Sequence, residues 1–380
     1  MILRFILDES AYKVVAFIEH TAGDNVGFMK QEPSSNFTPM GLSALQELMG
    51  SRNATCGERF LPSRSIPLPE SVSESFRRTI GLPYRDAEWN LDPPDAAGWR
   101  EAVARQAKII VPIIEQMCDR HGITVTQSTI ENVPVFDVIP SRISKENRSR
   151  LVLNLHGGGY VFNPGRAGLL EGVVLAISCG IRVLVVDYRM PPDHPFPAAL
   201  DDAFAVWSSI VKRYPHDTVA ISGASAGGGL AMATILRAQQ EGIQCPAALL
   251  IQTPWADLTQ VGDSFQTNEW LDNVVVSYSA MPVRLAKLYA NGHDYADPYL
   301  SPLQGDLRLF PPTMLLSGTR DLFLSLTVLT HRKLRRAGVP ASLHLIEGAS
   351  HYQYFINPFA DESQDAFAEM TIFINENLSE

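Results

Sequence analysis

The sequence has little cysteine, and none of it is clustered. Four cysteines occur in 380 residues, at Cys56, Cys118, Cys179 and Cys245, and no two of them form a CxxC pair. Structural zinc sites and dithiol redox centres need closely spaced cysteines. We therefore expect free thiols, no metal site and no redox chemistry at cysteine.

Long apolar runs are also missing. The segment from Met1 to Leu7 is apolar, but Arg4 interrupts it and Asp8 and Glu9 end it, which is too short for the apolar centre of a signal peptide. No other run approaches the length needed to cross a membrane. We expect a cytoplasmic protein with no stable insertion into a membrane.

Basic residues are too few and too scattered for a nucleic-acid-binding surface. The chain has 31 Lys and Arg against 41 Asp and Glu, a formal net charge of -10. The short basic cluster from Arg332 to Arg336 falls on a predicted helix, where a solvated helix face explains it. An acidic protein without a basic stripe repels phosphate backbones, so we expect no nucleic-acid partner and leave small neutral molecules open.

What the sequence does contain is an alternation of strand-length apolar runs with longer segments of helical period. The predicted strands are Leu151–Leu155, Val183–Asp187, Val219–Ser222, Ala248–Gln252, Thr313–Ser317 and Leu343–Ile346. The predicted helices are Ala167–Ser178, Ala198–Arg213, Ala226–Glu241, Ser325–Ala337 and a last one after Pro358. This alternation predicts an α/β fold with a mostly parallel sheet and helices on both faces. Ile123–Thr129 and Val133–Ile139, with turn residues Glu131 and Asn132, predict an antiparallel hairpin before it.

Two stretches break the pattern. Glu32–Pro94 is rich in Pro, Ser and Gly and shows only short periodic segments. Leu258–Leu300 interrupts the sheet alternation and is rich in Trp and Tyr, and an insertion of that length between strands is commonly a lid over a site. At 380 residues the chain also exceeds the size of a single core. We expect residues 1–120 to be an N-terminal extension that contributes to a helical cap, and residues 121–380 to be the main domain, with a cap insertion at about 258–300.

Gly223 to Gly227 reads GASAG, which matches GxSxG, directly after one predicted strand and before a predicted helix. A sharp strand-to-helix turn exposes the serine hydroxyl above the sheet, and its neighbours must be small because side chains would collide in the bend. The alternative is a glycine-rich turn that only packs a helix against a strand. The context favours Ser225 as a nucleophile.

A second glycine cluster, His156 to Gly159, also follows an apolar strand directly. Backbone N–H groups in such a loop stabilise the oxyanion of acyl transfer. The alternative is a phosphate-cradling loop, but neither cluster fits GxGxxG or ends in GK followed by Ser or Thr.

A base and an orienting carboxylate are also present in suitable places. Asp321 lies just beyond the predicted strand Thr313–Ser317, and His351 just beyond Leu343–Ile346, where open α/β sheets form their sites. The chain order Ser225, Asp321, His351 is that of a nucleophile-elbow hydrolase. Glu347, four residues before His351, is an alternative acid partner, and Asp321 is otherwise a surface charge paired with Arg320.

At this point the sequence resembles the hormone-sensitive-lipase-like esterases, also called family IV bacterial esterases, of the α/β-hydrolase superfamily. The resemblance covers about Leu151 to the C-terminus and rests on five segments: HGGG at His156–Gly159, DYR at Asp187–Arg189 with PDHPFP at Pro192–Pro197, the GASAG elbow, and the segments around Asp321 and His351. The stretch from Ser225 through Pro254, Trp255, Ala256, Asp257 and Leu258 is most similar to members acting on small esters and lactones.

The resemblance implies the α/β-hydrolase fold with a cap, a carboxylesterase acting on short-chain esters, no cofactor, and a homodimer by analogy. It also implies an oxyanion hole made of the HGGG glycines and the N–H of the residue after the nucleophile, which are Gly157, Gly158, Gly159 and Ala226. Tyr160, Phe162 and Trp255 adjoin these segments and are candidates for substrate contact, although aromatic residues near a core more often pack.

The sequence departs from the family at two points. Its commonest elbow reads GDSAG, whereas Ala224 stands here before the nucleophile, and the N-terminal extension is longer than usual. Two other functions use the same residues: an inert small-molecule-binding relative, which would be expected to lack His351, and an amidase with the same triad.

Overall fold

The structure is a computed structural model that describes residues 3–8, 13–18, 63, 65–84 and 87–379. The chain divides into two compact units, residues 1–65 and 66–380. In the first unit, β1 (Leu3–Asp8) pairs antiparallel with β2 (Lys13–Ile18). Cys56 and most of the irregular stretch Glu32–Pro94 lie outside the described residues.

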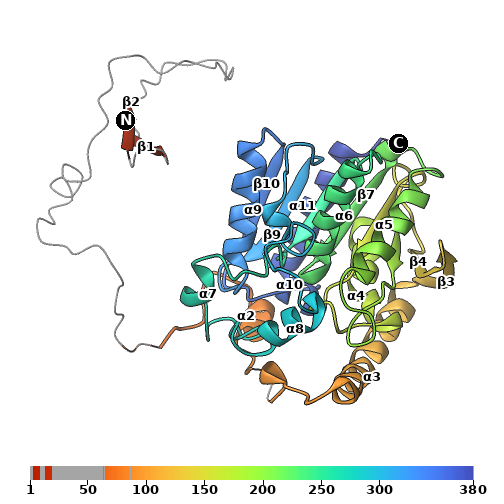
Figure 1. Ribbon diagram of the computed structural model, residues 1–380, viewed down its shortest axis with the longest axis horizontal. Helices are drawn as coiled ribbons and strands as arrows, with labels where there is room; N and C mark the ends of the chain where they lie inside the picture. Colours follow the sequence, from red (N-terminus) through yellow and green to blue (C-terminus); the bar gives the residue numbers. More distant parts are fainter. Residues whose placement is uncertain (1–2, 9–12, 19–62, 64, 85–86, 380) are drawn as a thin grey trace, which may run out of the picture. The chain divides into compact units, whose positions relative to one another are not determined.

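The second unit is built on an eight-stranded sheet in the order β10-β9-β8-β7-β5-β6-β4-β3 (Figure 1). Its strands are β3 (Thr124–Ile130), β4 (Val133–Ile139), β5 (Leu151–Leu155), β6 (Arg182–Val186), β7 (Val219–Ala224), β8 (Ala248–Gln252), β9 (Thr313–Gly318) and β10 (Ala341–Ile346). The strands from β10 to β6 are parallel, and β4 and β3 continue the sheet antiparallel. All parallel strands therefore end at the same edge, where a site can assemble.

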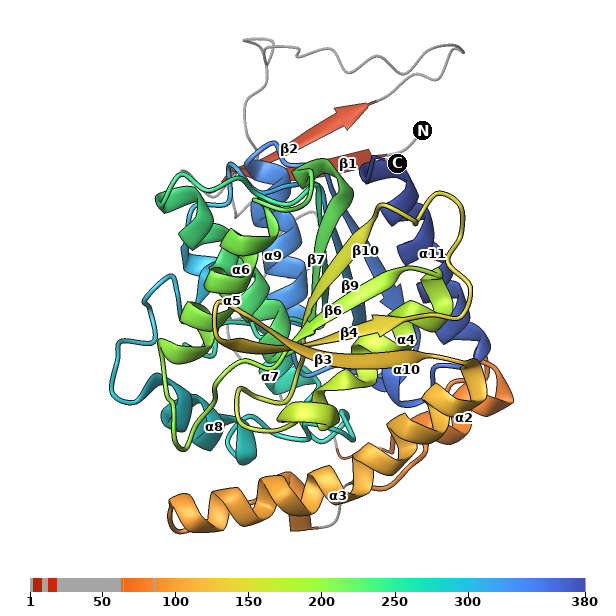
Figure 2. The same ribbon diagram turned by 90° about the vertical axis from the view of Figure 1, so that its right-hand side faces the viewer.

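Helices cover both faces of this sheet (Figure 2). The helices are α2 (Glu74–Ile80), α3 (Ala96–His121), α4 (Leu170–Cys179), α5 (Ala198–Ile210), α6 (Ala226–Gln240), α7 (Ser264–Thr267), α8 (Met281–Ala290), α9 (Leu324–Arg336), α10 (Gln353–Ile356) and α11 (Asp361–Asn377). Side chains of α5, α6 and α9 pack in one hydrophobic cluster, and those of α4 and α11 in another.

Alternating residues of the strands supply the two clusters. Along β5, Leu151, Leu153 and Leu155 belong to the first cluster and Val152 to the second. Because the side chains of a strand point to opposite faces in turn, a strand buried on both sides must be apolar throughout. This explains the continuous apolar runs in the sequence.

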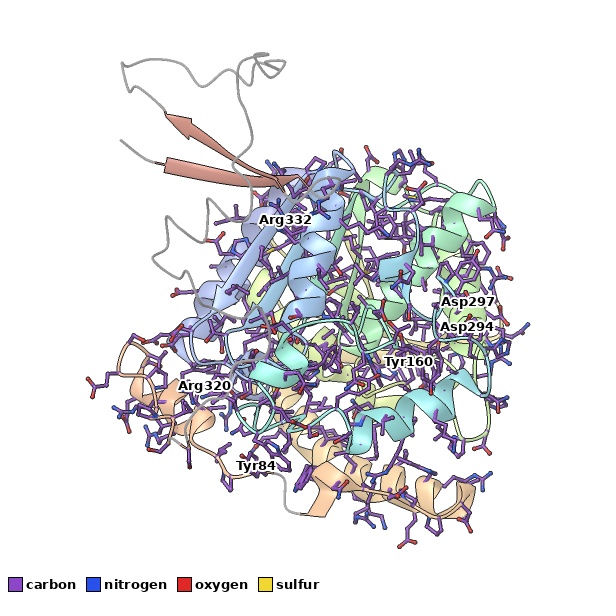
Figure 3. The ribbon with its side chains drawn as sticks, turned by 60° about the vertical axis from the view of Figure 1, so that its left-hand side comes forward. Tyr84, Tyr160, Asp294, Asp297, Arg320 and Arg332 are labelled. Carbon is purple, nitrogen blue, oxygen red and sulfur yellow. The ribbon has the colours of Figure 1, made fainter. Side chains whose placement is uncertain are left out.

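The predicted α/β fold is confirmed, and each predicted strand and helix of the sheet region is present with ends shifted by at most a few residues. The hairpin turn is also present: Glu131 and Asn132 both have positive φ, 50° and 66°, as a two-residue hairpin turn requires. The basic cluster lies on α9, where Arg332 is exposed (Figure 3). No helix among the described residues is long and apolar enough to cross a membrane.

The 26-residue helix α3 was not predicted from the sequence. It begins at Asp95, whose side chain accepts a hydrogen bond from the Gly98 N–H at 2.9 Å, and it ends at Gly122 with φ 65°. Pro112 lies inside it. In Figure 1, α3 lies with α8 and α10 at one end of the sheet. The expected domain boundary at residue 120 falls at the end of α3 and stays a prediction.

Candidate active site

The turn between β7 and α6 holds Ser225 in a strained conformation. Its φ and ψ are 55° and -121°, a combination that non-glycine residues rarely adopt. Neighbouring backbone keeps the turn in place, because the Ser225 N–H donates to the Gln252 carbonyl at 2.9 Å and the Ser225 carbonyl accepts from the Trp255 N–H at 2.8 Å. The glycines are required for packing: a Cβ on Gly227 would lie 1.8 Å from the Leu155 carbonyl oxygen.

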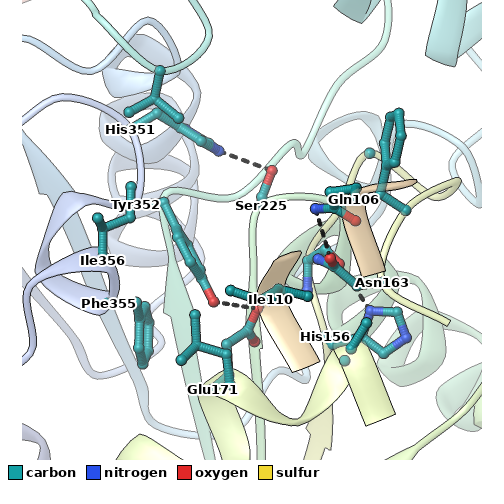
Figure 4. Close-up of a pocket in the computed structure, with 18 of the residues that line it drawn as sticks. Gln106, Ile110, His156, Asn163, Glu171, Ser225, His351, Tyr352, Phe355 and Ile356 are labelled. Carbon is teal, nitrogen blue, oxygen red and sulfur yellow. Dashed lines mark hydrogen bonds between the residues drawn. The ribbon is translucent and has the colours of Figure 1, made fainter. Parts of the chain in front are cut away.

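Ser225, His351 and Asp321 form a continuous chain of hydrogen bonds. The Ser225 Oγ lies 2.9 Å from His351 Nε2, and His351 Nδ1 lies 3.0 Å from Asp321 Oδ1 (Figure 4 shows the first contact). All three side chains are buried or nearly so. They come from the loops after β7, β9 and β10, which end at one edge of the sheet.

Asp321 is surrounded by hydrogen-bond donors. Ser317 Oγ donates to Oδ2 at 2.6 Å, the Thr253 hydroxyl also donates to Oδ2, and the Phe323 N–H donates to Oδ1 at 2.8 Å. Burial disfavours a charge on Asp321, but the adjacent imidazole of His351 and these donors outweigh it and lower the pKa of the carboxyl group. The group is therefore an anion positioned to orient His351.

A second buried carboxylate, Asp272, fixes the loops that carry this chain. Its Oδ2 accepts from the backbone N–H groups of Leu322 at 2.8 Å and His351 at 3.1 Å, and its Oδ1 accepts from those of Val274 and Val275. Burial, and then the charge of Asp321, raise the pKa of Asp272. Asp272 thus ties the insertion to the loops of Asp321 and His351.

The alternative acid, Glu347, lies elsewhere. It is exposed, and its Oε2 is 3.5 Å from the Thr319 hydroxyl. Arg320 donates to the Pro67 carbonyl at 2.7 Å. Neither residue contacts His351 or Asp321 through a side-chain hydrogen bond within the described part of the chain, so the geometry favours Asp321 as the partner of His351.

The HGGG loop lies beside Ser225, and both line the same pocket. Gly158 and Gly159 have φ of 124° and 61°, and a Cβ on either would clash, with the Phe162 carbonyl or with Leu285. Across the described residues, the N–H groups of these two glycines donate to no protein acceptor. His156 is buried against the Tyr188 ring, and burial lowers its pKa, so it is neutral and structural.

The pocket beside Ser225 is a cavity of about 340 Å³. Its walls come from α3 (Gln106, Ile110, Ile113, Met117), from the insertion and α8 (Val274, Val275, Met281, Leu285), and from the segment after His351 (Tyr352, Phe355, Ile356, Pro358). Most of these side chains are apolar, as expected for a site that takes a small organic molecule. Among the described residues, no group of His, Cys, Asp and Glu is placed to hold a metal ion.

The three aromatic candidates differ in position. Phe162 and Trp255 line the pocket. Tyr160, labelled in Figure 3, is 1% exposed and stacks on Tyr289 with ring centroids 3.7 Å apart, near Trp255. Tyr160 therefore supports Trp255 from within the core.

Sequence reasoning did not identify several polar residues around the site: Gln106, Asn163, Glu171, Thr253, Asp272 and Ser317. For Glu171 a signal existed, since it is the one acidic residue inside the apolar helical segment Ala167–Ser178. Asp272 carried no signal, because it lies in an irregular insertion among other polar residues.

Comparison with known proteins agrees with this geometry. A family model described as the α/β-hydrolase fold matches residues 152–355. An acetyl-hydrolase from Streptomyces hygroscopicus is 30% identical over 226 residues, which are 59% of this chain and 75% of that protein. An esterase from Acinetobacter venetianus is 26% identical over 276 residues, 69% of this chain and 86% of that protein.

Solved structures extend the similarity. The crystal structure of an esterase, E25, superposes with a TM-score of 0.82 at 37% identity, covering 84% of this chain and 99% of that one. The crystal structure of an esterase from the bacterial hormone-sensitive lipase family superposes with a TM-score of 0.64 at 26% identity, covering 72% and 99%.

Proposed function

Since the chain belongs to the α/β-hydrolase fold family, as a hormone-sensitive-lipase-like carboxylesterase, we propose that it cleaves its ester through Ser225, His351 and Asp321. The observation that carries this proposal is the hydrogen-bond chain from Ser225 Oγ to His351 Nε2, at 2.9 Å, and from His351 Nδ1 to Asp321. That chain can activate a hydroxyl group that is otherwise a weak nucleophile.

In the proposed reaction, the Ser225 oxygen forms a bond to the ester carbonyl carbon while His351 Nε2 takes the hydroxyl proton. The carbonyl electron pair moves to oxygen, giving a tetrahedral oxyanion. Collapse of this intermediate expels the alcohol, which takes the proton from His351. A water molecule then releases the acid from Ser225 by the same two steps. Asp321 holds the imidazole in the productive tautomer throughout.

We assign the oxyanion hole to the N–H groups of Gly158, Gly159 and Ala226, with Gly157 shaping the loop. Two features support this assignment: Gly158 and Gly159 line the pocket, and Ala226 is the first residue of α6, whose unpaired N–H groups favour an anion. Each such donor contributes ~10² or more in rate.

For the substrate, we propose short-chain esters, with lactones as a further class. Phe162 and Trp255 would contact the substrate from the pocket walls. We further propose that the segment before residue 121 and the insertion at about 258–300 form the cap, because α3 and α8 both line the pocket. A homodimer and a cytoplasmic location stay predictions from the sequence.

The test is hydrolysis of p-nitrophenyl acetate and butyrate by Ser225→Ala and His351→Ala, each expected to lose ~10⁶-fold in kcat. A fluorophosphonate probe should label the wild type and not Ser225→Ala. Near-normal hydrolysis by Ser225→Ala would refute the proposal. Matched esters and amides, assayed side by side, separate an esterase from an amidase.

A further inference from the structure

Glu171 is a buried acid beside the proposed site that the reaction above does not use. It lies in the first turn of α4, is 2% exposed, and lines the pocket. A carboxyl group that is nine-tenths buried needs hydrogen-bond partners to offset its desolvation. The identity of those partners indicates what it does.

Two of the partners of Glu171 belong to the loops on either side of Ser225, and the other two are the Asn154 side chain of β5 and the Ala224 backbone of the elbow. Its Oε1 accepts from the Gly157 N–H at 2.7 Å and from the Tyr352 hydroxyl at 3.2 Å (Figure 4 shows the latter contact). Gly157 opens the oxyanion loop, and Tyr352 directly follows His351. One carboxyl oxygen therefore joins the loop that would bind the oxyanion to the loop that carries the base.

The carbonyl group of Gly157 is held as well as its N–H. Its carbonyl accepts from Asn163 Nδ2 at 3.0 Å, and Asn163 Oδ1 accepts in turn from Gln106 Nε2 at 2.9 Å. With the N–H and the carbonyl both fixed, the peptide planes on either side of Gly157 cannot rotate. The Gly158 N–H shares a peptide plane with the Gly157 carbonyl and is oriented as a result. The next plane, which carries the Gly159 N–H, is held through the Gly158 carbonyl, which accepts from the N–H groups of Val161 at 3.1 Å and Phe162 at 2.8 Å.

Glu171 can accept these hydrogen bonds in either protonation state. Burial raises its pKa to about 7, against hydrogen bonds from Gly157, Asn154, Tyr352 and the Ala224 backbone that favour the anion. A neutral carboxyl group still accepts through Oε1. Its Oε2 lies 3.2 Å from Asn154 Nδ2, and Asn154 Oδ1 is a buried acceptor with no partner among the described residues. Turning the Asn154 amide over would let it accept the acid proton.

We propose that Glu171 is a positioning residue, whose carboxyl oxygen holds the Gly157 N–H and the Tyr352 hydroxyl and so sets the oxyanion loop relative to the base. This inference rests on the proposed function, because it assigns the oxyanion to the HGGG loop. This role requires a hydrogen-bond acceptor at Glu171. It does not require a negative charge, and a negative charge there would oppose the developing oxyanion.

The test compares Glu171→Gln with Glu171→Leu. The Gln amide oxygen can accept both hydrogen bonds and its NH₂ can donate to Asn154, so kcat should stay within about threefold of the wild type. Leu has a similar volume and no acceptor, so kcat should fall about 10-fold or more while KM changes less than about twofold, since one donor of an oxyanion hole contributes ~10² to 10³.

A trifluoromethyl ketone inhibitor supplies a second readout. It adds to Ser225 and places an oxyanion in the hole, so its affinity for Glu171→Leu should fall in parallel with kcat. The matched methyl ketone, bound without the addition, should bind both proteins equally. Tyr352→Phe, which removes one of the two held groups, should lower kcat about threefold.

The matched control is Val174→Ala, one turn along α4 and buried in the core. It should lower the melting temperature and leave kcat unchanged, which separates damage to the helix from loss of the contact.

Wild-type kcat in Glu171→Leu, or a Glu171→Gln variant as impaired as Glu171→Leu, would overturn the inference. If Glu171→Leu does not fold, an impaired Glu171→Gln variant would still overturn the inference, and the threefold loss of kcat in Tyr352→Phe, together with an active Glu171→Gln, would support it. Activity in Ser225→Ala would instead refute the proposed function.

Discussion

At the scale of single residues, Asp321 has more hydrogen-bond donors around it than its link to His351 requires. Ser317 and Thr253 hold Oδ2, so that Oδ1 stays directed at the imidazole. Burial raises the pKa of the carboxyl group, but the adjacent imidazole of His351 and then these two donors outweigh burial and lower that pKa. Replacing this carboxylate by an amide of the same shape should therefore lower kcat sharply, because the amide can present an N–H donor to His351.

Replacing Asp321 by Asn should lower kcat by ~10⁴-fold, since the imidazole would be held in the wrong tautomer. Glu347→Gln is the matched control, and it should retain wild-type kcat because Glu347 is exposed and contacts Thr319. Steady-state hydrolysis of p-nitrophenyl butyrate measures both. A larger loss in Glu347→Gln than in Asp321→Asn would reverse the assignment of the acid.

Glu171 should make the stability of the protein depend on pH. Its pKa is raised from 4.5 to about 7, so the folded state binds the proton more tightly than the unfolded state. The stabilising contribution is full below about pH 4.5 and is lost as the pH rises through about 7. Between pH 5 and pH 8, the free energy of unfolding of the wild type should fall by about 2 to 3 kcal/mol relative to Glu171→Gln. Urea unfolding at the two pH values measures this, and an equal pH dependence in both proteins would contradict it.

The sequence alone predicts site residues that are marked by their neighbours in the chain. Ser225 lies in a motif whose glycines are needed for close packing, and His351 follows a strand in the expected chain order. Glu171 and Asp272 instead contact groups on other segments of the chain: Glu171 accepts from the Gly157 N–H, 14 positions before it, and from the Tyr352 hydroxyl, 181 positions after it. Such partners are known only once the loops are placed in space.

At the scale of secondary-structure elements, α3 decides the shape of the pocket. Ile110, Ile113 and Met117 line the cavity from successive turns. The neighbouring Ile109 is 57% exposed and lies outside the lining. One helix thus offers adjacent isoleucines, Ile110 toward the pocket and Ile109 toward solvent.

Ile110→Phe should shorten the acyl chains that the enzyme accepts, because the larger ring fills part of the cavity. The ratio of kcat/KM for p-nitrophenyl octanoate to that for the acetate should fall about 10-fold. Ile109→Phe, the control, should leave the ratio unchanged. An acyl-chain series from acetate to palmitate gives the result, and an unchanged ratio in Ile110→Phe would mean that the acyl chain lies elsewhere.

The contact between α6 and β5 leaves no room for a side chain at Gly227, where a Cβ would lie 1.8 Å from the Leu155 carbonyl. Gly227→Ala should therefore destabilise the fold by at least about 3 kcal/mol and displace the elbow. Ala233→Gly in the same helix should cost about 1 kcal/mol through helix propensity. Thermal unfolding compares the two, and equal losses would show that the close approach is not the cause.

Elements with clear periodicity were predictable, and α3 was not. The central strands β5, β7, β8 and β9 are mostly apolar runs because both faces are buried, and the helices beside them pack one apolar stripe each. In α3 several isoleucines face the pocket or solvent and Pro112 lies within the helix, so the apolar pattern does not mark a single buried stripe.

At the scale of the whole molecule, one sheet separates two hydrophobic clusters. Leu230 of α6 belongs to one and Met370 of α11 to the other, and both are almost fully buried. Because every parallel strand contributes side chains to both clusters, loss of packing on one face weakens the layer that supports the other.

Leu230→Ala and Met370→Ala should each cost about 2 to 5 kcal/mol. Both should move the same single unfolding transition of residues 66–380 to lower denaturant concentration. Urea unfolding followed by tryptophan fluorescence and by far-UV circular dichroism tests this. Separate transitions in either variant would show that the two faces unfold independently.

The pocket walls and the groups proposed to react lie on different parts of the chain. Ser225, Asp321 and His351 follow strands of the sheet, whereas α3 and α8 provide much of the wall. Substrate preference can therefore change through substitutions that leave the chemistry intact. For directed evolution, a library confined to the pocket-facing positions of these two helices should yield variants of altered selectivity with few inactive members.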